Sequence, residues 1–143
     1  MYTSVTEKNK RKAQKDAAVF LGVSILTGLF GAIYELFSHE VYSYFMIYAF
    51  AFPLLLGTLP CLFLSLSGGT RYPNALCRNL YHAGIATLTT GSIMRGVLDI
   101  YGTTNSLSNI YWFAGIPMTV LPVFIFCFQR KKLRAVKNEN AAA

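Results

Sequence analysis

Charged residues are scarce in this sequence. Asp, Glu, Lys and Arg make up 13% of the 143 residues, whereas hydrophobic residues make up 54%. A soluble domain has about 25% charged residues, so this balance favours lipid over water as the main solvent. The net charge of +7 does not indicate nucleic-acid binding, because the basic residues flank apolar runs and do not interleave with aromatic residues on one polar surface.

Cysteine is also scarce, and the few cysteines form no recognisable metal or redox motif. The chain has Cys61, Cys77 and Cys127, with no CxxC or Cys/His spacing that would indicate zinc. All three fall on the cytoplasmic side of the topology predicted below, where thiols stay reduced. We therefore expect them to serve in packing. The connection 67–78 lacks the Gly-Lys-Ser/Thr ending of a phosphate-binding loop. The sequence predicts no cofactor, no metal ion and no catalytic residue.

Lys and Arg are missing from two of the connections between the apolar runs. Twelve of the thirteen lie before the first run, in the middle connection or after the last run: Lys8, Lys10, Arg11, Lys12, Lys15, Arg71, Arg78, Arg130, Lys131, Lys132, Arg134 and Lys137. Lys and Arg next to a span resist translocation. This partition therefore predicts four spans, with the N-terminus and the C-terminus both in the cytoplasm.

The fold class predicted from this pattern is all-α: an integral membrane protein with a bundle of four transmembrane helices, arranged as two helical hairpins. We expect the spans at roughly 17–38, 41–66, 79–101 and 110–128, because about 20 apolar residues cross the hydrocarbon core. Residues 1–16 and 129–143 would be basic cytoplasmic segments. The first run is too long for the apolar part of a signal peptide and no small-x-small site follows it, so we expect an uncleaved span.

Two of the predicted spans are unusual. Span 79–101 is the most polar, and a hydropathy scan alone could reject it. It is retained because, without this crossing, the basic C-terminal segment would lie outside. Span 41–66 contains Pro53 and Pro60, which remove backbone donors and should kink the helix. The kink could be a hinge for alternating access or a static bend, and the sequence leaves both interpretations open.

Small and ionisable residues recur every fourth position in two spans. The stripe in the first span is Val23, Thr27, Gly31, Glu35 and His39, and the stripe in the third is Ala83, Thr87, Gly91, Arg95 and Asp99. Residues four apart share one helix face. Because small residues let helices approach closely in lipid and intramembrane charges face the bundle interior, we expect the two stripes to meet. Glu35 would then pair with Arg95, and His39 with Asp99.

These four residues, Glu35, His39, Arg95 and Asp99, are the predicted ligand-binding cluster, near the outer leaflet. Two interpretations stay open: the groups only neutralise one another within the membrane, or they form a site. As a site, Arg95 would bind an anionic or zwitterionic ligand that the carboxylates orient. Alternatively, Glu35 or His39 would carry protons in coupled transport. A divalent metal is disfavoured because Arg95 would repel a cation.

The second histidine, His82, is expected at the cytoplasmic start of the third span, bonded to a lipid headgroup or to a nearby carbonyl. A haem ligated by two histidines needs both at a similar depth. His39 and His82 lie at opposite ends of their spans, which argues against haem.

The function that these patterns favour is a small ligand- or partner-binding accessory protein, multi-pass, in a bacterial-type plasma membrane. Its surroundings would be the lipid bilayer and, because four short helices make a small bundle, a homo-oligomer or a larger membrane complex. The alternative is a proton- or ion-coupled small transporter subunit. A small membrane enzyme is the second alternative, although no nucleophile–base motif supports it.

Overall fold

The computed structural model describes residues 2–38, 41–66 and 73–142, with side chains described for 6–38, 41–66 and 73–129. All regular structure in these residues is helical. The elements, in chain order, are α1 (Tyr2–Leu36), α2 (Tyr44–Ile47), the π-helix η1 (Phe52–Thr58), α3 (Leu59–Leu66), α4 (Ala75–Ile100), the 3-10 helix η2 (Ser106–Ser108) and α5 (Asn109–Ala142).

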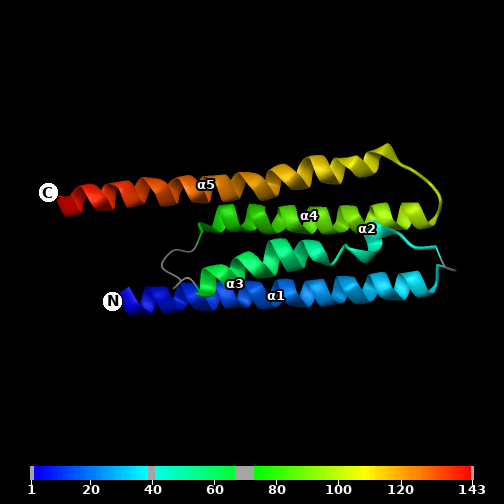
Figure 1. Cartoon of the computed structure of the whole chain (residues 1–143), viewed down its shortest axis with the longest axis horizontal. Helices are drawn as coiled ribbons and strands as arrows, with labels where there is room; N and C mark the ends of the chain where they lie inside the picture. The colour runs from blue at the N-terminus through cyan, green and yellow to red at the C-terminus, as the bar shows by residue number, and fades with distance from the viewer. Residues whose placement is uncertain (1, 39–40, 67–72, 143) are drawn as a thin grey trace.

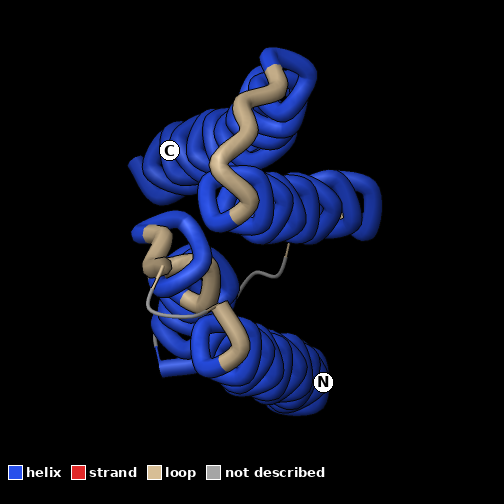
Figure 2. The backbone as a smooth tube through the Cα atoms, turned by 90° about the vertical axis from the view of Figure 1, so that its right-hand side faces the viewer, coloured by secondary structure: helices blue, strands red, loops and turns tan. Residues whose placement is uncertain are grey.

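The helices run up and down in one bundle (Figure 1). α1 packs against η1 and α3, α4 packs against α5, and α2 and η1 join the two hairpins by packing against α4. The view along the bundle shows the two hairpins one above the other (Figure 2). Residues 2–16 and 129–142 lie at one end, which we call the basic end (Figure 1). The opposite end, with residues 34–38, 41–46 and 95–108, is the distal end.

Three helical segments are long and apolar enough to cross a membrane: Thr6–Leu36, Tyr44–Leu66 and Ser106–Gln129. Their apolar side chains largely face outward; Leu66 and Phe113, for example, are both 80% exposed. An apolar exterior of this kind is stable in lipid and costly in water. The prediction of an all-helical chain is confirmed for the described residues, and three of its helices are compatible with crossing a membrane.

α4 is long enough to cross as well, with 26 residues, but it is more polar than the other three segments. Its polarity follows from its position, because it contacts α2, η1 and α5. Gly84, Leu88 and Gly91 are among its buried residues. A Cβ atom on Gly84 would lie only 2.8 Å from the backbone nitrogen of Thr119 on α5. Small residues therefore bring α4 and α5 into close contact.

α1 is a single helix of 35 residues that includes the basic segment. Its first half is rich in Lys and Ala, which have high helix propensity, and the apolar run from Val19 continues the same helix. At 1.5 Å per residue it is about 50 Å long. Since the hydrocarbon core is about 30 Å thick, the basic part of α1 extends well beyond one span.

The second predicted span is not one kinked helix but a broken one. α2 ends at Ile47, and a π-helix covers residues 52–58 before α3 begins. Pro60 cannot donate a hydrogen bond to the carbonyl four residues earlier, and the backbone shifts register here, with Leu59 N donating to the Leu54 carbonyl oxygen five residues before it. The predicted proline kink therefore describes only part of the distortion, because the span also contains a break and a π-helix.

Side chains from the neighbouring helices bind the carbonyl groups of this broken span. We call them the three hydroxyl bridges: Ser24 Oγ to Phe50 O at 3.0 Å, Tyr81 Oη to Leu56 O at 2.6 Å, and Ser92 Oγ to Phe45 O at 2.7 Å. In lipid, an unsatisfied backbone group costs several kcal/mol, so irregular backbone persists only where the protein supplies partners. Both α1 and α4 supply them here.

Candidate functional site

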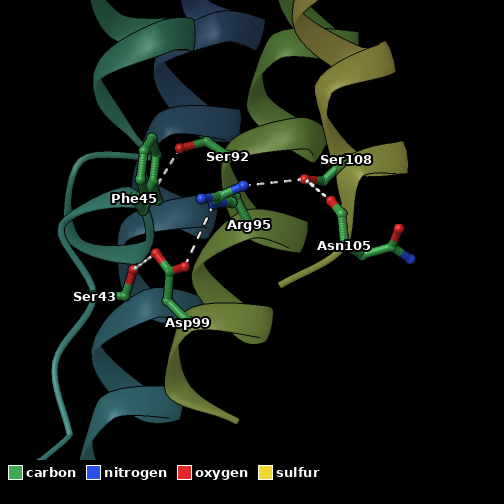
Figure 3. Close-up of polar contacts among 7 residues, drawn as sticks. All are labelled: Ser43, Phe45, Ser92, Arg95, Asp99, Asn105 and Ser108. Atoms are coloured by element: carbon green, nitrogen blue, oxygen red, sulfur yellow. Dashed lines mark hydrogen bonds and ion pairs between the residues drawn. The ribbon is translucent and has the colours of Figure 1, made fainter. Parts of the chain in front are cut away.

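Arg95 and Asp99 meet at the distal end of the bundle, one turn apart on α4. Arg95 Nε lies 3.4 Å from Asp99 Oδ1, and Arg95 Nη1 is within 3.5 Å of Ser108 Oγ in η2 (Figure 3). The Arg95 Cζ atom lies 5.7 Å from the ring centre of Phe45 in α2, a cation–π distance. The guanidinium group is thus held by a carboxylate, a hydroxyl and an aromatic face that come from different segments of the chain.

The network continues through Asp99. Its second carboxylate oxygen accepts a 3.1 Å hydrogen bond from Ser43 Oγ, at the residue before α2 (Figure 3). Ser108 Oγ donates to the Asn105 carbonyl at 2.7 Å, which leaves its lone pairs for Arg95. The side chains of Arg95 and Asp99 are 29% and 31% exposed. The pair is therefore anchored on one side and accessible on the other.

The backbone at the end of α4 also fixes this position. Gly102 adopts a left-handed conformation, with φ 69°. Its N–H bonds to the Asp99 carbonyl, and the N–H of Thr103 bonds to the Leu98 carbonyl. This is a Schellman termination, in which glycine avoids the steric cost of the left-handed region. It ends α4 at Ile100, one residue after Asp99, and directs the chain towards η2.

The predicted ion pair between Glu35 and Arg95 is not formed. Glu35 Oε1 is buried and has no hydrogen-bond partner among the described residues. The reason is that α2 lies between α1 and α4 at this level. A Cβ atom on Gly31 of α1 would lie 3.1 Å from the Met46 carbonyl oxygen, and one on Gly96 of α4 would lie 2.8 Å from the Met46 nitrogen. Met46 of α2 thus occupies the space in which the two stripes were expected to meet.

The stripe on α4 has a different neighbour. A Cβ atom on Gly91 would clash with the side chain of Tyr111 on α5. The interpretation that the two stripes face each other is therefore wrong. The period of four identifies one face of each helix, but it does not identify the helix that this face packs against.

The four residues of the predicted cluster therefore have different outcomes. The structure brings Arg95 and Asp99 together, and it places Glu35 on α1, unpaired with Arg95. His39 lies outside the described residues, so its pairing with Asp99 stays a prediction.

A second polar cluster, at the basic end, was missed by the sequence analysis. Asp16 Oδ2 of α1 lies 4.0 Å from Arg78 Nε and 3.7 Å from His82 Nε2, both on α4. The ring of Phe20 meets the edge of the His82 ring at a centroid distance of 4.8 Å. The signal was the four-residue spacing within each helix, 16 to 20 and 78 to 82. His82 was expected to bond a headgroup or a carbonyl, and instead it faces α1.

Two cavities lie along the bundle. One, at the basic end, has a volume of about 160 Å³ and is lined by α3, α4 and α5. The other, of about 400 Å³ at the distal end, lies between Phe30 and Tyr34 of α1, the following Phe37, and the end of α4 at Ile100. Within the described residues, no group of three His, Cys, Asp or Glu side chains is placed to hold a metal ion.

No protein-family model matches this chain, and no curated protein or solved structure does either.

Proposed function

We propose that the chain is an accessory protein of a bacterial-type plasma membrane that crosses the bilayer four times, with both ends in the cytoplasm. Three apolar helices support the membrane setting, and the position of α4 between α2, η1 and α5 supports a fourth crossing. The bundle runs up and down, so both ends of the described chain lie at the basic end (Figure 1). Lys and Arg next to a span favour the cytoplasmic side.

In this proposal the distal cluster binds an anionic or zwitterionic group of a small ligand or of a partner. The observation that carries it is the Arg95–Asp99 pair, which is accessible on one side and held on the other. A guanidinium group binds carboxylate or phosphate oxygens through two parallel N–H donors. Asp99 would orient the positive part of a zwitterion, with His39 as a predicted further member of the site.

Transport is the second candidate, because the second span is discontinuous. Broken helices near the membrane centre form the ion and substrate sites of many transporters, where free carbonyl groups coordinate the cargo. Here, however, three carbonyl groups of the broken span already accept hydrogen bonds from Ser24, Tyr81 and Ser92. Because these carbonyl groups are bonded to protein side chains, they are less available to coordinate a transported ion or substrate. This favours a binding protein over a transporter.

Soluble headgroup analogues test the binding proposal. The thermal midpoint of the full-length protein in detergent would be measured with phosphoethanolamine, inorganic phosphate or ethanolamine. A ligand at one hundred times its Kd stabilises a protein by about 2.7 kcal/mol, so we expect phosphoethanolamine to raise the midpoint by several degrees. Phosphate alone should have a smaller effect, and ethanolamine alone none.

The matched variants are Arg95→Gln and Lys8→Gln, which remove the same charge from α4 at the distal end and from α1 at the basic end. Arg95→Gln should abolish the response to phosphoethanolamine, whereas Lys8→Gln should keep it. A wild-type protein that responds to none of the three compounds, or an unchanged response in Arg95→Gln, would contradict the proposed site.

A further inference from the structure

The cavity at the basic end is a groove with apolar walls and a rim that carries Arg78 and His82, both next to Asp16. It is lined by Pro60, Cys61 and Leu64 of α3; Cys77, Arg78, Tyr81 and His82 of α4 with the preceding Pro73; and Pro122, Val123 and Phe126 of α5. Pro60 lies just after the π-helix of the second span, and Pro122 lies within the continuous helix α5.

The interior of the groove offers almost nothing polar to a ligand. The Tyr81 hydroxyl donates a 2.6 Å hydrogen bond to the Leu56 carbonyl. Tyr81 therefore contributes the carbon atoms of its ring to the groove, and its hydroxyl is not available to a ligand. Val123 is 46% exposed, and the groove wall therefore continues into the outer apolar surface of α5. A cavity of about 150 Å³ lined by apolar side chains accommodates a molecule as large as benzene. The volume here, about 160 Å³, suits a segment of a hydrocarbon chain.

The rim of the groove, in contrast to its interior, carries charged and polar side chains. Arg78 lies one turn before His82 on α4, and Asp16 contacts both. A guanidinium group has five N–H donors, so Arg78 can serve Asp16 and a phosphate oxygen together. The basic part of α1 adds Lys8, Lys10, Arg11, Lys12 and Lys15 at the same end. Each Lys or Arg near a membrane surface attracts anionic lipid by about 1 kcal/mol.

We propose that this groove binds one acyl chain of an anionic phospholipid, with the phosphate of its headgroup at Arg78. An apolar channel continuous with the lipid-facing surface selects a chain, and the guanidinium group of Arg78 at its rim selects an anionic headgroup in the same leaflet. The inference rests on the membrane setting proposed above but not on the distal cluster. The lipid groove can therefore be disproved without disproving ligand binding at the distal cluster, and the reverse also holds.

Matched lipids test it. The full-length protein in detergent would be titrated with phosphatidylglycerol or phosphatidylcholine of identical acyl chains, and bound lipid would be counted by native mass spectrometry. One Arg contact worth about 1 kcal/mol corresponds to a preference of about fivefold, so we expect phosphatidylglycerol to bind about five times more tightly. Soluble glycerol phosphate should not compete, because it has no chain.

Two sets of variants separate the headgroup contact from the chain contact. Arg78→Gln should remove the preference for phosphatidylglycerol, while Arg78→Lys and Lys8→Gln should retain most of it. Val123→Trp should fill the groove and weaken both lipids. Its control is Val120→Trp, because Val120 is similarly exposed, at 42%, and does not line the groove.

Three results would overturn the proposal: equal binding of the two lipids to the wild type, an unchanged preference in Arg78→Gln, or equal effects of the two tryptophan variants. Arg95→Gln, which changes the distal cluster, is the control that connects this experiment with the headgroup-analogue experiment. Its lipid preference should match the wild type, so failure of the headgroup-analogue experiment and failure of this one are distinguishable.

Discussion

The hydroxyl group of Tyr81 on α4 donates a 2.6 Å hydrogen bond to the carbonyl oxygen of Leu56 in the π-helix. In an α-helix this carbonyl would accept from the residue four positions later, which here is Pro60, a residue without an N–H group. A side chain from a neighbouring helix thus supplies a donor to a carbonyl in the stretch where Pro60 has no N–H group. Ser24 and Ser92 bind two other carbonyl groups of the same span. Hydrogen bonds from α1 and from α4 therefore fix the broken segment, which favours a static structure over a hinge.

Tyr81→Phe tests this replacement. Removing the hydroxyl leaves the Leu56 carbonyl without this donor, and hydrogen bonds between membrane helices are worth about 0.6 kcal/mol and at most about 1.7 kcal/mol. We expect a loss near the upper value, because the carbonyl is inside the bundle. Thermal unfolding in detergent measures it. Tyr44→Phe is the control, since Tyr44 is 78% exposed, and equal losses in the two variants would contradict the account.

Pro60→Ala should reduce the cost of Tyr81→Phe. Alanine restores an N–H group that can reach the Leu56 carbonyl, so the tyrosine hydroxyl is no longer the sole replacement donor. We expect a coupling free energy of about 0.5–1 kcal/mol between the two substitutions, as for residues that share a hydrogen-bond acceptor. The double-mutant cycle is measured by thermal or denaturant unfolding. Strict additivity would mean that the proline and the tyrosine act independently.

Gly96→Ala should destabilise the bundle, because the new Cβ atom would lie 2.8 Å from the Met46 backbone nitrogen and force α2 away from α4. Overpacking of this kind costs about 1–3 kcal/mol. Gly22→Ala is the matched control on α1, where a Cβ atom meets nothing within 4 Å. There alanine should be neutral or stabilising, by up to about 1 kcal/mol, because of its helix propensity. Equal unfolding midpoints for the two variants would exclude Met46 as the spacer between α1 and α4.

Arg95→Leu should couple to Asp99→Asn and not to Glu35→Gln. Arg95 contacts Asp99 at 3.4 Å, whereas α2 separates it from Glu35. Ion pairs one turn apart on a helix are worth about 0.3–0.5 kcal/mol, so we expect a coupling of that size for the first pair and additivity for the second. Comparing the unfolding midpoints of the single and double variants distinguishes the two, and coupling to Glu35 would restore the predicted meeting of the two stripes.

Much of the fold could be predicted from the sequence, because lipid imposes simple rules. Long apolar runs and the positions of Lys and Arg indicate where helices cross, and the structure has helices in all four predicted spans. The polar third span was retained on charge placement, and its polarity has a packing reason: Gly84, Thr89 and Ser92 are buried against neighbours. Hydropathy alone could not supply that reason, because it averages over the faces of a helix.

The candidate site was less predictable. Its residues were chosen from helix periodicity, which treats each span as a continuous rod. Because the second span is broken after Ile47, α2 lies between α1 and α4. Arg95 therefore pairs with Asp99 and not with Glu35, the partner predicted from the sequence. The cluster of Asp16, Arg78 and His82 was missed for a related reason: the Lys and Arg residues of that region were interpreted only as topological signals.

The crossing of α4 is the claim on which both proposed sites depend, and cysteine labelling tests it most directly. In a variant whose native Cys61, Cys77 and Cys127 are replaced by alanine, Asn74→Cys marks the start of α4 and Thr104→Cys marks the residues beyond its end. A membrane-impermeant maleimide should label Thr104→Cys in intact cells and Asn74→Cys only after the cells are permeabilised. Labelling of both positions from the same side would mean that α4 does not cross, and the four-span account would be wrong.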